Sequence, residues 1–179
     1  VYMNINFERL IQFHTDHQAM ATLCAHPNDH PYDSDLIETN EHHQITAFHS
    51  KPHLDGINYR NLVNAGCYVI QTSLLSDISP DKPADFGKDI FPSWINKYTL
   101  FAYNTSEHMK DMGTPKRYQQ VMHDVEQKND VFYSYEQQSR TIFFDRDGVL
   151  NDNNDTYVCS PDELHLYDDV IPALELLKA

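Results

Sequence analysis

The chain has 179 residues, which suits one ordinary domain or parts of two, and 40% of them are hydrophobic, enough for a buried core. Its formal net charge of −14 argues against nucleic acid or an anionic membrane as a partner, because both are polyanions. The charge does not argue against phosphorylated small molecules, since a bound cation can bridge them to acidic side chains.

The cysteines and the hydropathy pattern point to a cytoplasmic protein. Cys24, Cys67 and Cys159 are far apart and form no CxxC pair, so a reduced cytosolic chain is the simplest interpretation. We expect no signal peptide and no membrane span, because no apolar run approaches the roughly 20 residues that cross a bilayer. The chain begins at Val1 without an initiator methionine, so we expect a fragment.

The first predicted elements are one helix and three strands. Residues 6–17 favour a helix with Asn6 as N-cap. Phe7, Leu10, Ile11 and His14 lie on one face of this helix, and Phe7 is expected in the core. Residues 19–26 form a short buried strand, and strands at 35–40 and 44–50 are expected to pair as a hairpin.

The next segment, residues 61–71, is a β-branched and aromatic strand that contains Gly66. A glycine inside a strand often marks the close approach of a ligand or of another backbone. Residues 83–97 suggest a helix interrupted by proline, and residues 98–104 suggest another strand.

A helix is predicted at residues 113–127, where Thr114 is the N-cap and Pro115 takes the first helical position. Its apolar face is expected to comprise Tyr118, Val121, Met122 and Val125. Polar and aromatic residues without clear period follow at 128–139 and predict a linker.

The last part of the chain is predicted to contain a buried strand at 141–145 and a helix within 160–179. Strands and helices therefore alternate over the whole sequence. This alternation predicts an α/β fold.

The sequence "RTIFFDRDGVLND", residues 140–152, carries two carboxylates at i and i+2 directly after the predicted strand. Asp145 is placed to attack phosphorus and form an aspartyl-phosphate, while Asp147 protonates the leaving oxygen and later activates water. Gly148 permits a tight turn beside them, and the concentrated negative charge calls for Mg²⁺. The alternative is an ordinary Asx-rich surface turn.

The stretch "FFDRDGVLN" resembles the first motif of the haloacid-dehalogenase (HAD-like) phosphatases. With "SPDELHLYDDVIPALELLK" it looks like their heptose-bisphosphate and histidinol-phosphate branch. The resemblance implies Asp145 and Asp147 as catalytic residues and Mg²⁺ ligands, and Asn151 as a substrate-binding residue. The later motifs of that family have no counterpart here. They include a loop that binds Zn²⁺, so zinc is expected only in a part beyond Ala179.

A second constellation lies upstream in "DMGTPKRYQQV", residues 111–121. Asp111 precedes a helix N-terminus, which attracts phosphate through its unpaired N–H groups, and its carboxylate is placed to hold a metal against that phosphate. A plain capping turn is the alternative.

Four stretches in this order, "SKPH", "NAGCYVI", "PADFGKDIFP" and "DMGTPKRY", resemble the second half of sugar-phosphate nucleotidyltransferases. The resemblance implies that Lys51 contacts the sugar phosphate, that Asn64 and Gly66 line the sugar site, and that Asp111 binds Mg²⁺. The Gly-rich nucleotide loop and the first metal-binding Asp of the family are absent, and that Asp is expected just before Val1.

Together the two resemblances predict a chain across the joint of a bifunctional enzyme. Residues 1–126 correspond to the C-terminal half of a Rossmann-like mixed-sheet nucleotidyltransferase, 127–139 to a linker, and 140–179 to the first β-strand, loop and helix of a HAD-like phosphatase. We expect the fragment alone to be inactive.

The implied substrates are a sugar phosphate, most simply a heptose phosphate, and an NTP. We expect no nucleic-acid or membrane partner, and a homo-oligomer is compatible with the sequence. Two alternatives stay open. One is a mannose or glucose 1-phosphate nucleotidyltransferase with a histidinol-phosphate-like phosphatase, and the other is a non-catalytic interaction segment.

Overall fold

The computed structural model describes residues 1–136, 142–152 and 158–177. The chain divides into two compact units, Val1–Gln138 and Ser139–Ala179. The strands of the first unit are β1 Tyr2–Asn4, β2 Ala21–His26, β3 Leu36–Thr39, β4 Ile45–His49, β5 Val63–Ile70, β6 Leu100–Asn104 and β7 His108–Lys110. Its helices are α1 Phe7–Asp16, α2 Phe91–Trp94, α3 Pro115–Glu126 and α4 Asn129–Phe132, with shorter helical turns at η1 Pro31–Asp33, η2 Thr72–Asp77 and η3 Phe86–Ile90.

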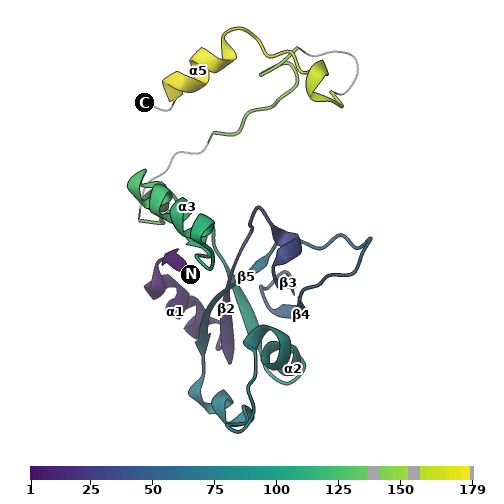
Figure 1. The fold of residues 1–179 in the computed structure, drawn as a ribbon, viewed down its shortest axis with the longest axis vertical. Coiled ribbons are helices and arrows are strands. Elements are labelled where there is room, and N and C mark those ends of the chain that lie inside the picture. The colour runs from purple at the N-terminus through teal and green to yellow at the C-terminus, as the bar shows by residue number, and fades with distance from the viewer. Residues whose placement is uncertain (137–141, 153–157, 178–179) are drawn as a thin grey trace. The chain divides into compact units, whose positions relative to one another are not determined.

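A five-stranded mixed sheet forms the centre of the first unit (Figure 1), with the strand order β4-β3-β5-β2-β6. Strands β3 and β4 pair antiparallel, which confirms the predicted hairpin. Strand β2 pairs antiparallel with β5 and parallel with β6. Strands β1 and β7 form a separate two-stranded antiparallel sheet. The predicted mixed α/β architecture is confirmed for this unit.

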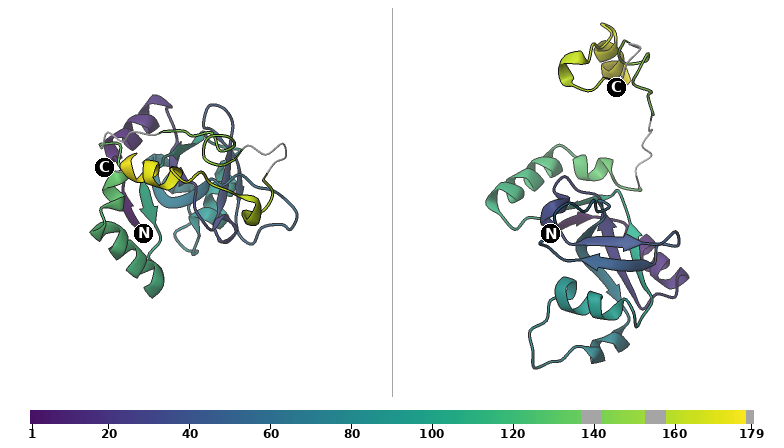
Figure 2. Two further views of the ribbon diagram at one scale, coloured as in Figure 1. Left: turned by 90° about the horizontal axis from the view of Figure 1, so that it is seen from above. Right: turned by 90° about the vertical axis from the view of Figure 1, so that its right-hand side faces the viewer.

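Helices cover both faces of the central sheet (Figures 1 and 2), because successive side chains of a strand point to opposite faces. Leu23 of β2 packs in one apolar cluster with Phe91 and Trp94 of α2. The next residue, Cys24, packs in a second cluster with Leu10 of α1. The buried strand β2 therefore contributes side chains to the apolar clusters on both faces of the sheet.

Helix α1 begins as predicted, since the Asn6 side chain accepts a hydrogen bond from the Arg9 backbone N–H at 3.0 Å. Leu10 and His14 are buried against the sheet. Phe7 is 52% exposed, so its prediction as a core residue is wrong, and Ile11 on the same face is 54% exposed. The periodicity located the apolar stripe correctly, but the sheet covers only one side of it.

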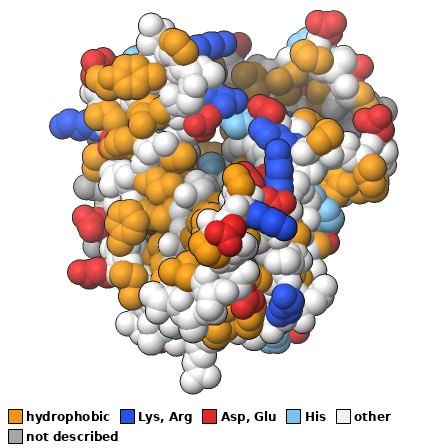
Figure 3. Space-filling model, turned by 60° about the horizontal axis from the view of Figure 1, so that its bottom comes forward, with side chains coloured by type: hydrophobic (Ala, Val, Ile, Leu, Met, Phe, Trp, Pro, Cys, Tyr) orange, Lys and Arg blue, Asp and Glu red, His pale blue; other side chains and the backbone are white. Residues whose placement is uncertain are grey.

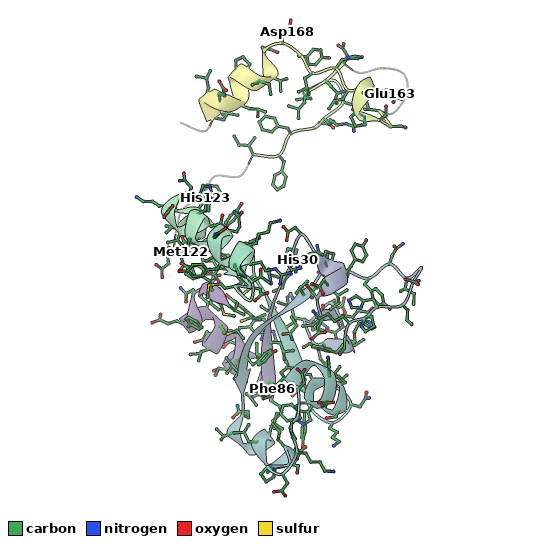
Figure 4. The ribbon with its side chains drawn as sticks, in the orientation of Figure 1. His30, Phe86, Met122, His123, Glu163 and Asp168 are labelled. Atoms are coloured by element: carbon green, nitrogen blue, oxygen red, sulfur yellow. The ribbon has the colours of Figure 1, made fainter. Side chains whose placement is uncertain are left out.

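Helix α3 also begins as predicted, with Thr114 Oγ1 accepting from the Arg117 backbone N–H at 3.2 Å. Of its predicted apolar face, only Val121 is buried. The remaining members of that face, Tyr118, Met122 and Val125, are exposed, and Met122 is labelled on α3 in Figure 4.

The segment expected to be a linker contains a helix, α4, in its described part, 128–136. Asp130 of α4 is buried, and its carboxylate accepts a hydrogen bond from the Tyr2 hydroxyl. The Asn4 amide donates to the Asp130 backbone oxygen at 3.2 Å. These contacts over more than a hundred residues tie α4 to β1, which no local pattern signals. Residues 137–139 lie outside the described residues.

The second unit contains η4 Pro161–Glu163 and α5 Val170–Leu177, so the predicted helix within 160–179 is confirmed. The predicted buried strand is wrong for Ile142–Phe144, which form no strand and are 54%, 93% and 44% exposed in chain order. Apolar and aromatic residues favour strands, but a strand is stable only when it pairs and packs. Arg140 and Thr141 lie outside the described residues.

The face of the molecule in Figure 3 shows hydrophobic side chains with acidic and basic side chains scattered among them. Within the described ranges, no helix combines the length and the apolar character that a membrane crossing requires.

The core around α2 supports a stability prediction. Trp94 is 1% exposed and packs edge-on against Phe91, with ring centroids 6.1 Å apart. Trp94→Ala is expected to lower the free energy of unfolding by ~3–5 kcal/mol, whereas Tyr32→Ala at an 86% exposed position changes it by less than ~0.5 kcal/mol. Urea unfolding followed by circular dichroism measures both variants. Tryptophan fluorescence cannot serve, because Trp94 is the chain's single tryptophan and Trp94→Ala removes it. Equal effects of the two variants would contradict the packing described.

Three histidines with lowered pKa values predict a loss of stability in mild acid. Desolvation lowers the pKa of His14, His26 and His108 below the usual 6.5. Below pH 6.5 the unfolded chain then binds more protons than the folded one, so stability falls as the pH drops from that value toward the lowered pKa values.

This loss is measured by the urea midpoint, which is expected to be lower at pH 5.5 than at pH 7.5. His108→Gln should reduce the difference between the urea midpoints at pH 5.5 and pH 7.5. His42→Gln, at an exposed side chain, is the matched control and should leave it unchanged. A pH dependence that His108→Gln leaves intact would show that other groups cause it.

Candidate functional site

A cavity of about 280 Å³ in the first unit brings together four residues that the sequence singled out. Lys51 follows β4, Asn64 and Gly66 belong to β5, and Asp111 follows β7; all four line the cavity. Three separate segments therefore converge on one hollow.

A bulge in β5 shapes one wall of this cavity. Leu23 is opposite Tyr68, whereas Ala25 is opposite Asn64, so three residues of β5 face Cys24 alone. Gly66 lies in this bulge with φ +75°, a conformation that L side chains rarely adopt. Apart from Gly66 and its two chain neighbours, no atom lies within 4 Å of the position that a Cβ would take, so the bulge leaves open space where a ligand can approach.

Lys51 is held at the cavity by two aspartates. Its Nζ donates to the Asp33 backbone oxygen at 2.9 Å and to Asp33 Oδ1 at 3.1 Å. The Lys51 backbone N–H donates to Asp35 Oδ1 at 3.2 Å. The hydrogen bond from Lys51 lowers the pKa of the Asp33 carboxyl, which keeps that carboxylate ionised.

Asp35 also restricts which residue can occupy position 87, because its carboxylate lies beside Gly87 in the fold. A Cβ at Gly87 would lie 2.5 Å from Asp35 Oδ2, closer than real Cβ contacts allow. The backbone oxygen of Gly87 accepts a hydrogen bond from the Ser50 hydroxyl at 3.0 Å. Ser50, which directly precedes Lys51, thus fixes the loop to η3.

Asp111 is held in a fixed orientation on the other side of the cavity. Its Oδ1 accepts from the Gly113 backbone N–H at 3.0 Å, and its Oδ2 accepts from Arg117 Nη1. Desolvation opposes ionisation, but the Gly113 N–H and the Arg117 guanidinium outweigh it, so the pKa of Asp111 is lowered. Asp111 is therefore a carboxylate over the whole neutral range.

Arg117 connects the two sides, and the sequence analysis did not single it out. Besides its contact with Asp111, Arg117 Nη2 lies 3.7 Å from Asp33 Oδ2. Its signal was present in "DMGTPKRY", where Arg117 lies six residues after Asp111 and inside the first turn of α3. Asp33 had no such signal, because its role depends on a contact with Lys51 across 18 residues.

Lys51 and Arg117 together give the cavity the chemistry of a phosphate site. Both side chains are partly exposed, with fractions of 47% and 37%, and both are paired with Asp33. A phosphate dianion entering the cavity would compete with that aspartate for two cations. Such charge-assisted hydrogen bonds are the strong ones in phosphate recognition.

A larger cavity of about 840 Å³ adjoins this one on the side of β7 and α3. Asp111 and Arg117 line both cavities, as does His30, which Figure 4 labels. The Asp111–Arg117 pair thus marks a boundary between two hollows, an arrangement that suits a ligand with two parts.

The donor set suits a metal held jointly with substrate. Within residues 1–136, 142–152 and 158–177, no three His, Cys, Asp or Glu side chains are grouped to hold a metal ion. Asp111 supplies one carboxylate. Mg²⁺ is commonly bound by one or two carboxylates together with substrate phosphates and water, so the residues present fit that mode.

In the second unit, the predicted phosphatase loop forms a tight turn. Gly148 has φ +78°, and its N–H donates to the Asn151 backbone oxygen at 2.8 Å. The Leu150 N–H donates to the Arg146 backbone oxygen at 2.8 Å. Asn151 is 1% exposed and donates to the Asp152 backbone oxygen at 2.8 Å. Asn151 is therefore a buried anchor of this turn.

The two predicted catalytic carboxylates lie close together in sequence on this turn but differ in environment. Asp145 is exposed and accepts from the Arg146 backbone N–H at 2.8 Å. Asp147 binds the Arg146 guanidinium at 2.8 and 3.1 Å, and this hydrogen bonding lowers its pKa. Asp147 is thus ionised here, the form of a general base and not of a general acid.

The fold defines a mixed α/β protein, and its first cavity places two cationic side chains, Lys51 and Arg117, beside the central strand β5. Residues 1–128 match the nucleotidyl transferase family, and the chain belongs to that family.

The chain is 28% identical over 116 residues to mannose-1-phosphate guanylyltransferase catalytic subunit beta of Drosophila melanogaster, covering 65% of this chain and 30% of that protein. It is 27% identical over 119 residues to glucose-1-phosphate adenylyltransferase of Clostridium novyi, covering 62% and 30%. The chain therefore spans about a third of the length of these curated relatives.

Solved structures share the fold. HddC from Yersinia pseudotuberculosis matches with a TM-score of 0.56 at 16% identity, over 69% of this chain and 51% of that one. HddC complexed with GMP-PN matches with a TM-score of 0.54 over the same shares. At this identity the likeness concerns the fold alone.

Proposed function

We propose that the first unit binds a sugar 1-phosphate and serves nucleotidyl transfer from an NTP to that phosphate. The observation that carries the proposal is the convergence of Lys51, Asn64, Gly66 and Asp111 on one cavity, with Arg117 between them. The names of the curated relatives, a mannose-1-phosphate guanylyltransferase and a glucose-1-phosphate adenylyltransferase, support the same reaction class.

In this reaction an oxygen of the sugar phosphate attacks the α-phosphorus of the NTP, a new P–O bond forms, and the bond to pyrophosphate breaks. Lys51 neutralises and holds the attacking phosphate, and the Asn64 side chain and the open face of Gly66 receive the sugar. Arg117 bridges the sugar-phosphate cavity and the larger cavity that it shares with Asp111. Catalysis then rests on positioning and charge neutralisation.

Asp111 would hold Mg²⁺, which supplies charge neutralisation for the polyphosphate when it is bound. The lowered pKa of Asp111 keeps the carboxylate charged for that role at neutral pH. Arg117 donates to Oδ2 and the Gly113 N–H donates to Oδ1, and each oxygen keeps a further lone pair with which it would bind the metal.

Among the possible sugars we favour a heptose, with mannose and glucose as the alternatives. The heptose assignment rests on the resemblance of residues 140–179 to a heptose-bisphosphate phosphatase, because a bisphosphate phosphatase and a 1-phosphate transferase act in sequence on one sugar. The printed names of the relatives support mannose or glucose instead.

A second activity, phosphatase chemistry in the second unit, is favoured by the geometry of its turn. Asp145 and Asp147 flank Arg146 on a turn closed by Gly148 and anchored by the buried Asn151. Two carboxylates in that arrangement suit nucleophilic attack on phosphorus by Asp145 and activation of water by Asp147, and Asp147 serves the leaving group once it has taken up a proton.

The proposed transfer is tested with the full-length protein, GTP or ATP, and a panel of mannose, glucose and heptose 1-phosphates. Lys51→Ala is expected to raise KM for the sugar 1-phosphate by about 10–100-fold with a smaller change in kcat, because a ground-state phosphate contact is lost. Lys97→Ala, at an exposed lysine outside both cavities, is the control. An unchanged KM in Lys51→Ala would contradict the assignment of this cavity.

A further inference from the structure

Two cysteines lie side by side behind the wall of the candidate sugar-phosphate cavity. Cys24 in β2 and Cys67 in β5 belong to neighbouring antiparallel strands, at the bulge where β5 gains residues. Both point to the α1 side of the sheet, where they pack in the apolar cluster that contains Leu10. Cys67 packs against the buried cluster to which Cys24 belongs, so the two side chains are neighbours.

The distance between neighbouring strands permits a covalent bond between these thiols. Paired strands lie about 4.7–4.9 Å apart, and disulfides join Cα atoms about 4.4–6.8 Å apart. Both cysteines pack in one cluster on the same side of the sheet, so neither strand has to turn over for the bond to form.

The two cysteines differ in access and in acidity. Cys24 is fully buried, whereas Cys67 is half-buried and reachable by a small molecule. The hydrogen bond from Cys24 lowers the pKa of the Cys67 thiol to about 7, while the same pairing and burial raise the pKa of Cys24 far above its usual value. At neutral pH a substantial share of Cys67 is therefore thiolate while Cys24 stays protonated, which suits Cys67 as the attacking thiol and Cys24 as the resolving one.

We propose that Cys67 is a peroxide-reactive thiol and that Cys24 resolves it into a cross-strand disulfide. The Cys67 thiolate attacks one oxygen of hydrogen peroxide, the O–O bond breaks, and hydroxide leaves and takes up a proton to become water. The Cys24 sulfur then attacks the sulfur of the Cys67 sulfenic acid, and the S–S bond forms as a second water leaves. Two thiols are oxidised and one peroxide is reduced.

The disulfide has a consequence for the candidate site, and that consequence rests on the proposed function. Gly66 and Asn64, which line the cavity, lie one and three residues before Cys67 in the same bulge. Joining Cys67 to β2 would pull the bulge toward the sheet and shift the open face of Gly66. Oxidation should therefore weaken capture of the sugar 1-phosphate, and a dithiol reductant should restore it.

The disulfide is tested by mass spectrometry on full-length protein carrying Cys159→Ser, which leaves the proposed pair as the thiols of the described region. The protein is treated with hydrogen peroxide, alkylated with N-ethylmaleimide and digested with trypsin. Cleavage after Arg60 separates the two cysteines into different peptides, so a linked pair identifies the bond. We expect this linked pair, its loss after dithiothreitol, and no crosslink between chains.

Two further measurements examine the roles of the cysteines. The rate of Cys67 oxidation should rise about fivefold between pH 6 and pH 7, as a thiol with a pKa of about 7 requires. In Cys24→Ala the rise should move to higher pH, and dimedone should trap a sulfenic acid on Cys67. A pH profile that Cys24→Ala leaves unchanged would overturn the assigned roles.

The linked peptide distinguishes this proposal from the proposed function. If both cysteines remain alkylated after peroxide, or if only chain-to-chain disulfides form, the cross-strand disulfide is refuted whatever the activity. A linked peptide in a protein whose reduced form transfers no nucleotide supports the disulfide and contradicts the proposed function instead.

Discussion

Replacing Asp111 by asparagine is expected to lower kcat/KM for nucleotidyl transfer by about 10²–10³-fold, in line with the loss of a key charge from an electrostatic site. Asparagine keeps the size of the side chain, and its amide oxygen still accepts the hydrogen bond from the Gly113 N–H. It lacks the negative charge that would hold Mg²⁺. The effect should therefore appear as a weaker metal dependence and not as unfolding.

The same substitution releases Arg117, which now binds Asp111 on one side and lies near Asp33 on the other. A released Arg117 can still bind phosphate, so KM for the sugar 1-phosphate should change much less than kcat. Titration with MgCl₂ and with the sugar 1-phosphate separates the two effects. Asp55→Asn, at an exposed aspartate outside both cavities, controls for loss of charge alone.

Normal transfer by Asp111→Asn would refute the placement of the metal. A loss of activity that is fully explained by a higher KM for the sugar phosphate would instead assign Asp111 to sugar binding. The lowered pKa of Asp111 adds a further check: its carboxylate loses charge only in acid, below the usual range of an aspartate, so activity should not fall from this cause between pH 8 and pH 6.

The second large effect is expected at Asp145. If Asp145 is the covalent nucleophile, Asp145→Asn should abolish phosphatase turnover, by more than about 10³-fold, because the amide is a poor nucleophile while its size is unchanged. Asp162→Asn, a carboxylate in η4 of the same unit, should be close to wild type. Release of phosphate from a sugar bisphosphate by full-length protein measures both variants.

Asp147→Asn should behave differently from Asp145→Asn. It should still form some phosphoenzyme from a substrate with a good leaving group, but it should hydrolyse that intermediate slowly, since the base for water is lost. The Arg146 guanidinium now lowers the pKa of Asp147, so action as an acid requires Arg146 to leave it first.

Beryllium fluoride, which mimics an aspartyl-phosphate, provides the direct test of the nucleophile. A fluoroberyllate adduct located on Asp145 in full-length protein agrees with the prediction. An adduct on another carboxylate, or undiminished turnover by Asp145→Asn, would remove Asp145 from that role.

Local sequence predicted most of the longer elements of the first unit, but not β1, β7 or α4, and it predicted much of the candidate site. The N-caps at Asn6 and Thr114 were predictable because a cap depends only on residues three positions away. The hairpin of β3 and β4 followed from short-range alternation. Lys51, Asn64, Gly66 and Asp111 came from motifs, and the structure does gather them around one cavity.

Other features were decided only by contacts between distant segments. Phe7 carries the same apolar signal as Leu10 but remains exposed, because the sheet reaches only one of them. Ile142–Phe144 have strand-forming side chains but no partner strand among the described residues. The sequence shows which side chains favour burial or strand pairing. Whether a partner strand or an apolar surface is close enough to cover them depends on the tertiary structure.

The residues of the candidate site also fall into two groups: those that the sequence predicted and those that only the tertiary structure revealed. The sequence predicted the carboxylate Asp111 and the cation Lys51 as site residues. Their partners Arg117 and Asp33 are brought to them only by the folding of α3 and η1. Cys24 and Cys67 are 43 positions apart in the chain and gave no motif, yet strand pairing places them in contact. Charges and thiols act over a few ångströms, so their reactivity is set by tertiary neighbours that short-range patterns in the sequence do not identify.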